Sequence, residues 1–122
     1  MQSKSIINAA VVFLGLMASA PAMAQTAADE RDFQQLGHTL KANDAERQSA
    51  IKTCTEQGIG DNPAAAAEFM GVPVERAAAV WCTRMTNGIA NGQLTLTDIR
   101  GLNTGTVSAR ARRVLTTVSE GE

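Results

Sequence analysis

The first 24 residues have the pattern of a secretory signal peptide, which limits the folded protein to the 98 residues 25–122. Lys4 supplies a positive charge near the start, and a mostly apolar stretch follows over residues 6–17. The small-residue motif Ala22-Met23-Ala24 is typical of a signal-peptidase site, so we expect cleavage after Ala24. The sequence therefore predicts one small secreted domain, located in the periplasm of a Gram-negative bacterium, with no integral membrane span after cleavage.

Two cysteines, Cys54 and Cys82, remain after this cleavage. In an oxidising compartment, two cysteines in one small domain most simply pair with each other. The alternative is a thiol-disulfide redox site, but neither residue belongs to a Cys-x-x-Cys motif at a helix start. We therefore predict a structural disulfide between Cys54 and Cys82, with redox chemistry as the lesser alternative.

Helical signals dominate the first half of the predicted domain. Apolar residues recur at helical spacing over residues 30–42, and residues 25–29 are expected to be a frayed lead-in. Asn43 with Glu46 resembles a capping box, but the apolar stripe continues past it, so residues 30–57 form one helix or two. Asn62-Pro63 predicts the start of a short helix that ends at Gly71. Residues 74–86 are then expected to form the central helix.

The second half predicts turns and two further helices. Asn87-Gly88 and Asn91-Gly92 are turn dipeptides. Thr95 with Asp98 predicts a capped helix, although the alternation over residues 93–97 also allows an extended segment. Ser108 is expected to cap an amphipathic helix that reaches residue 118, and residues 119–122 are expected to fray. The fold class is therefore all-α, a small bundle of four to six short helices tied by one disulfide.

Composition excludes several classes of function. Removal of Lys4 leaves ten Lys and Arg residues against twelve Asp and Glu residues, which does not favour nucleic acid as a partner. The sequence contains no Cys-x-x-Cys-His haem motif and no nucleophile motif of the Gly-x-Ser-x-Gly type. The only histidine, His38, has no nearby Cys or Asp pattern. We therefore expect no enzyme activity, no cofactor and no metal site.

Two features are candidates for partner binding. Arg110, Arg112 and Arg113 cluster near the end of the chain, where they form either a solvated face or a docking surface for an acidic partner. Trp81 precedes a cysteine and is either a core residue or an exposed anchor in a binding groove.

These observations predict an exported, non-enzymatic helical module that binds another envelope protein or a second copy of itself. The alternative is an envelope-stress or chaperone-like factor, because the size, export and single cysteine pair are similar to those of periplasmic acid-stress chaperones. The similarity is one of class alone, since it includes no shared sequence motif.

Overall fold

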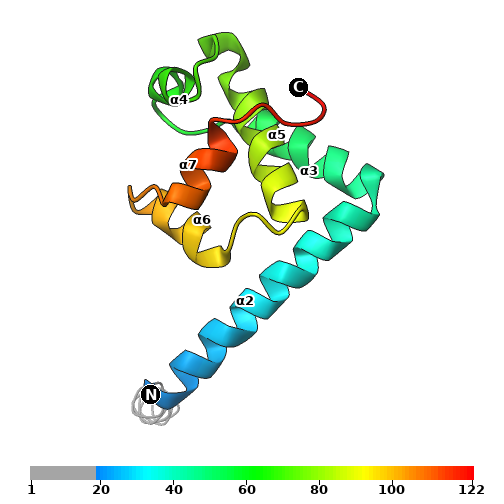
Figure 1. Ribbon diagram of the computed structural model, residues 1–122, viewed down its shortest axis with the longest axis vertical. Coiled ribbons are helices and arrows are strands. Elements are labelled where there is room, and N and C mark those ends of the chain that lie inside the picture. Colours follow the sequence, from blue (N-terminus) through cyan, green and yellow to red (C-terminus); the bar gives the residue numbers. More distant parts are fainter. Residues whose placement is uncertain (1–18) are drawn as a thin grey trace, which may run out of the picture. The chain divides into compact units, whose positions relative to one another are not determined.

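The computed structural model describes residues 19–122, with side chains described from residue 27 onward, and Figure 1 shows the arrangement of its helices. The chain divides into two compact units, residues 1–32 and residues 33–122. Most of the predicted signal peptide, residues 1–18, lies outside the described residues. Helix α2 (Ser19–Ala42) includes the predicted cleavage site, and cleavage itself remains a prediction. Residues 25–29, expected to fray, are helical as part of α2.

The second unit is built entirely from helices in the part of the chain that the structure describes. Asn43 separates α2 from α3 (Asp44–Gln57), because its backbone is extended and its side chain accepts a hydrogen bond of 3.1 Å from the Glu46 backbone N–H. The guanidinium of Arg47 then donates to the carbonyl of Leu40 at 3.1 Å, satisfying one of the last carbonyls of α2. Residues 30–57 therefore form parts of two helices, which answers the question that the sequence left open.

The predicted start and end of the next helix are confirmed. Helix α4 (Pro63–Met70) begins after Asn62, whose side chain accepts from the Ala65 backbone N–H at 3.2 Å, and ends at Gly71 in the left-handed conformation. A short 3-10 turn, η1 (Val74–Arg76), leads into the central helix α5 (Ala77–Ala90).

The turn predicted at Asn87-Gly88 is wrong, since both residues lie inside α5. Gly88 is buried there, and a Cβ on it would lie 2.8 Å from a methyl carbon of Val114 and 2.9 Å from one of Leu94. The glycine therefore allows close packing at this point of the helix and does not break it. The chain turns only after Ala90, with Gly92 at a positive φ of 70°.

Two short helices complete the fold. Helix α6 (Leu96–Asn103) begins with the predicted capping box of Thr95 and Asp98, so residues 93–95 precede the helix and Leu96 starts it. Helix α7 (Ala109–Leu115) begins at the predicted cap, Ser108. It stops at Leu115, earlier than predicted, and Val118 is 75% exposed.

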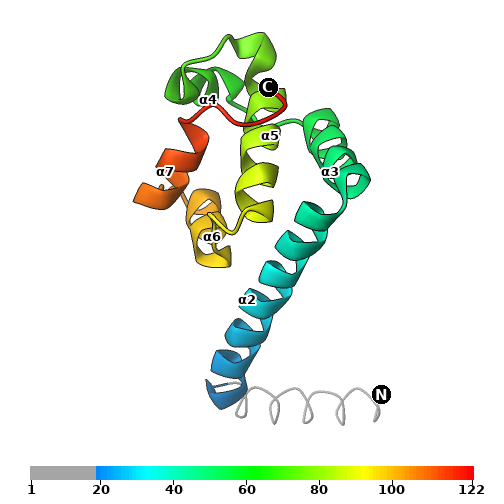
Figure 2. The same ribbon diagram turned by 45° about the vertical axis from the view of Figure 1, so that its right-hand side comes forward.

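Helix α5 provides most of the buried surface of the second unit. It lies between α3 on one side and α6 with α7 on the other in both views of the molecule (Figures 1 and 2). Its residues Ala77 and Val80 pack with Ala67 and Met70 of α4. Further buried side chains come from the segment before α6 and from α7: Leu94, Ala111 and Leu115. The all-helical fold class is thus confirmed for the described residues.

Candidate functional site

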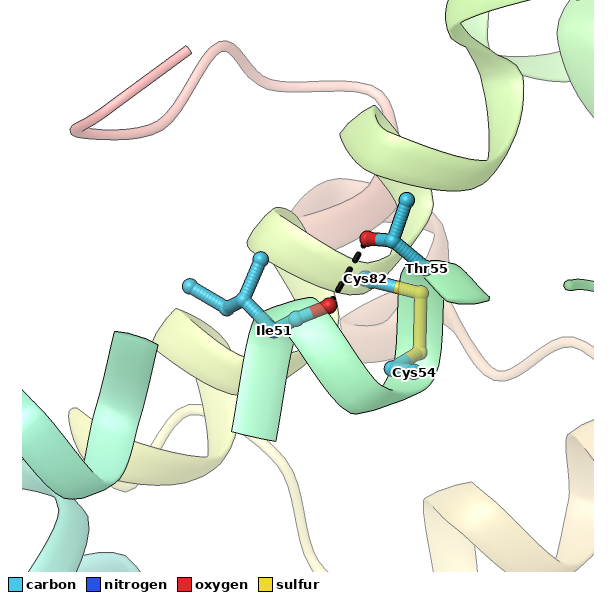
Figure 3. The surroundings of a disulfide bond; sticks show 4 residues. All are labelled: Ile51, Cys54, Thr55 and Cys82. Atoms are coloured by element: carbon cyan, nitrogen blue, oxygen red, sulfur yellow. Dashed lines mark hydrogen bonds between the residues drawn. A yellow bond between two sulfur atoms is a disulfide. The ribbon is translucent and has the colours of Figure 1, made fainter. Parts of the chain in front are cut away.

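The predicted disulfide joins α3 to α5. The Sγ atoms of Cys54 and Cys82 are bonded, with their Cα atoms 5.8 Å apart, and Figure 3 shows the bond beside the backbone of α3. In the same turn of α3, the hydroxyl of Thr55 donates to the carbonyl of Ile51 at 2.7 Å. Cys82 is completely buried, which restricts the access of a second thiol to its sulfur and favours a structural bond over an exchanging one.

A groove of about 490 Å³ lies on a different part of α5. It is lined by the second half of α5 and the residues that follow it, by α7, and by residues 117–120. Most of the lining residues are of polar or charged types, although the lining surface itself is divided about evenly between polar and apolar atoms: Arg84, Asn87, Gly88, Asn91, Gly92, Gln93, Arg110, Arg113, Val114, Thr117, Val118, Ser119 and Glu120. Guanidinium and amide groups donate hydrogen bonds, so this groove is chemically suited to anionic or carbonyl-bearing ligands.

Arg84 is the buried charge at one end of the groove. Its side chain is 3% exposed, and its Nε and Nη2 donate to the two carboxylate oxygens of Glu122 at 2.8 and 3.0 Å. Its Nη1 donates to the carbonyl of Leu115 at 2.6 Å, at the end of α7. Each of the three guanidinium nitrogens thus donates a hydrogen bond, which helps to offset the cost of burying an arginine. The same contact gives a donor to the carbonyl of Leu115, the last residue of α7.

Asn87 holds the segment that precedes Glu122. Its side-chain amide donates to the hydroxyl of Ser119 at 2.8 Å and to the backbone carbonyl of Glu120 at 2.9 Å. The backbone N–H of Ser119 donates to the Glu122 carboxylate at 2.7 Å. Residues 119–122 are therefore fixed to α5 by several hydrogen bonds, where the sequence predicted a frayed tail.

Arg110, Arg112 and Arg113 are close in sequence, but their side chains do not all lie in the same place in the structure. Arg110 and Arg113 both line the groove. Arg112 points to a different neighbour, with its guanidinium carbon 5.1 Å from the centre of the Phe69 ring of α4. Trp81, the other candidate, is partly buried and packs at the edge of the core formed by α4 and α5. It does not line the groove.

Asp98 links the groove to α6. The Arg110 Nε lies 4.0 Å from Asp98 Oδ2, and the Ser108 hydroxyl donates to Asp98 Oδ1 at 2.8 Å. Partial burial raises the pKa of the Asp98 carboxyl, but hydrogen bonds from the Thr95 backbone, the Ser108 hydroxyl and the Thr95 hydroxyl outweigh it and hold the pKa below its usual range. This carboxylate therefore orients Arg110 from outside the groove.

Arg84 and Asn87 were not identified as site residues from the sequence. The helical spacing of Arg84 could have indicated its buried position. Arg84 follows Ala77 and Val80 at spacings of seven and four residues, which places a charged residue on the buried face of α5. A charge on an apolar helical face requires a buried partner. The partner, Glu122, lies 38 residues further along the chain and has no local signal.

None of the helices in the described part of the chain is both long and apolar enough to cross a membrane. Among the residues with described side chains, no three His, Cys, Asp or Glu residues are grouped so that they could hold a metal ion. A comparison with protein-family models, with curated proteins and with solved structures finds no match to this chain.

Proposed function

We propose that this protein is an exported, non-enzymatic binding module that holds an acidic segment of a partner protein in the groove between α5, α7 and residues 117–120. The observation that carries the proposal is that Arg110 and Arg113 line one groove together with the side-chain amides of its other residues. Arginine binds carboxylates through two parallel hydrogen bonds, so two arginines in one groove favour a ligand with several carboxylates.

The groove chemistry favours binding over catalysis. A guanidinium stays protonated at physiological pH, and the amides of Asn87, Asn91 and Gln93 do not titrate. The hydroxyl of Ser119 lies in the groove wall but receives its hydrogen bond from an amide, which cannot act as a general base. A partner held by charge would bind more weakly as the salt concentration rises.

The arginines also differ in how far they are neutralised within the protein. Arg110 has Asp98 nearby, whereas Arg113 makes no ion pair with another residue whose side chain is described. The side chain of Arg110 is 54% exposed, so it remains accessible to a ligand. Arg110 and Arg113 are therefore the residues that we expect to contact an acidic partner.

Calorimetric titration with a Glu-rich peptide, and with the matching Gln-rich peptide, tests the proposal. Wild-type protein is expected to bind the acidic peptide and not the neutral one. The double variant Arg110→Ala with Arg113→Ala is expected to lose at least about tenfold in affinity, since each lost charge-assisted contact contributes roughly 1.5–3 kcal/mol.

Arg112→Ala is the matched control for this titration. It removes the same charge from the same helix, but Arg112 lies against Phe69 and outside the groove. Its affinity for the acidic peptide is expected to remain within about twofold of wild type. Equal binding by wild type and the double variant, with all proteins folded by circular dichroism, would contradict the proposal.

A second candidate function is an acid-responsive chaperone-like factor. It is favoured by two carboxyls that hold separate parts of the fold together and have lowered pKa values, Asp98 and Glu122. Protonation of both would release residues 119–122 and loosen α6 from α7. Dye binding and helicity are measured between pH 7 and pH 3. Increased dye fluorescence with retained helicity supports this function; an unchanged signal contradicts it.

A further inference from the structure

Residues 119–122, here called the acidic strap, are held against α5 by polar contacts, and Ser119 and Glu120 form part of the groove lining. Their sequence, Ser-Glu-Gly-Glu, has no apolar side chain to bury. The strap is held by the amide of Asn87, which reaches the Ser119 hydroxyl, and by the guanidinium of Arg84, which binds the Glu122 carboxylate with two hydrogen bonds. Any segment that offers the same polar groups can replace such a strap, since no buried apolar area is lost in the exchange.

We propose that the acidic strap is an internal copy of the ligand, and that a partner segment with a Ser-x-x-Glu pattern displaces it. The partner's hydroxyl would take the place of Ser119 on Asn87, and its carboxylate would take the place of Glu122 on Arg84. This inference rests on the proposed function and adds to it the pattern of the ligand and an autoinhibitory role for the strap.

Charge complementarity explains how a partner segment could bind the groove more tightly than the strap does. Arg110 and Arg113 continue the groove beyond Arg84, and neither makes a hydrogen bond or ion pair with residues 119–122. The strap brings one carboxylate to the buried arginine and leaves these two arginines to other ligands. A partner segment with further acidic residues reaches all three, so it replaces the contacts of the strap and adds new ones.

Two matched variants of the full chain test this inference. Glu122→Gln removes the carboxylate that competes for Arg84. Glu56→Gln makes the same change of charge at an exposed position of α3 that does not line the groove. The probe is a fluorescent peptide with the sequence of residues 116–122 and an amidated end, titrated by anisotropy.

Glu122→Gln is expected to bind the peptide at least tenfold more tightly than wild type, and Glu56→Gln is expected to bind like wild type. A peptide with Gln in place of its final Glu is expected to bind the Glu122→Gln protein at least tenfold more weakly. Ser119→Ala, which loosens the strap and leaves the buried ion pair in place, is expected to raise affinity by a smaller factor of two to five. This last variant keeps the inference testable if Glu122→Gln does not fold.

Equal affinity of the peptide for wild type, Glu56→Gln, Ser119→Ala and any folded Glu122→Gln protein would overturn the inference. Equal binding of the Glu and Gln peptides would overturn it too. Neither result affects the proposed function if the Glu-rich peptide still requires Arg110 and Arg113. Loss of binding to every acidic peptide would overturn both.

Discussion

At the residue scale, Arg84 connects three parts of the second unit. Its guanidinium joins α5 to the end of α7 through the Leu115 carbonyl and to the strap through Glu122. The hydrogen bonds from Arg84 hold the pKa of the Glu122 carboxyl below its usual range, in opposition to partial burial. A buried arginine with this set of partners is tolerated only while all of them remain in place.

Arg84→Met is expected to lower the free energy of unfolding by about 3–5 kcal/mol, since it leaves a carboxylate and a carbonyl without their buried donor. Urea denaturation followed by circular dichroism at pH 7 measures the loss. Lys52→Met, at an exposed position of α3, is the control and is expected to change stability by less than about 0.5 kcal/mol. A loss below 1 kcal/mol for Arg84→Met would contradict the central role of this side chain.

Gly88 permits the close approach of α7 and Leu94 to α5. Alanine normally favours a helix over glycine by about 1 kcal/mol. At this position the added Cβ would lie 2.8 Å from Val114 and 2.9 Å from the completely buried Leu94, so repacking must outweigh that gain. Gly88→Ala is therefore expected to destabilise the protein by about 1–3 kcal/mol in urea denaturation. A higher stability than wild type would contradict the packing described for this contact.

At the scale of elements, α3 depends on its covalent link to α5. None of its residues is fully buried, so apolar packing alone holds it weakly. Replacement of Cys54 and Cys82 by Ala is expected to lower the free energy of unfolding by about 3–4 kcal/mol, through the greater entropy of the unfolded chain. Thermal unfolding measures this loss of stability. Hydrogen exchange in the double variant is expected to be faster in α3 than in α4.

Reductant provides the control for that pair of variants. The melting temperature of wild type is expected to fall when the disulfide is reduced, whereas the double alanine variant is expected to show no response to reductant. Identical melting curves for wild type and the double variant would show that the cross-link adds nothing to stability.

Asp98 couples α6 to α7 through Thr95 and Ser108. Because the folded-state pKa of Asp98 is lowered, its contribution is present above the usual aspartate range and is lost as the pH falls through the folded value. Asp98→Asn is expected to reduce the free energy of unfolding by about 1–2 kcal/mol at pH 7. It is also expected to differ less from wild type at pH 3.

Urea denaturation at the two pH values measures this dependence. Asp61→Asn, an exposed residue in the loop before α4, is the matched control, with little change expected at either pH. An equal loss at pH 7 and pH 3 for Asp98→Asn would contradict an electrostatic origin and indicate a purely steric one.

At the scale of the whole molecule, export and oxidation are tested by mass. Protein recovered from the periplasm is expected to begin at Gln25 and to be two hydrogens lighter than its reduced form. Intact-mass measurement with and without reductant checks both. A chain that retains residues 1–24 would contradict the predicted cleavage, and a mass that does not change on reduction would contradict the disulfide.

The sequence by itself determined the class of fold and the places where most helices begin. Asn62, Thr95 and Ser108 each cap a helix as predicted, and Asn43 caps α3, which was one of the two alternatives that the sequence left open. Caps are predictable because a cap acts on backbone N–H groups within three residues of itself. The cysteine pairing could also be predicted from the sequence, since only two cysteines follow the predicted cleavage site.

The groove depends on contacts between residues that are distant in the sequence, so only the tertiary structure reveals it. The carboxylate of Glu122 reaches Arg84 across 38 residues, and the neighbours that keep Gly88 inside a helix come from Leu94 and Val114. Arg84 also binds the carbonyl at the end of α7, and a hydrogen bond from the Ser119 backbone to Glu122 helps to hold residues that the local pattern predicts to be frayed. A cap is satisfied by its own turn, whereas a buried charge is satisfied only when the folded chain brings its partner to it, and this physical difference separates what could be predicted from what could not.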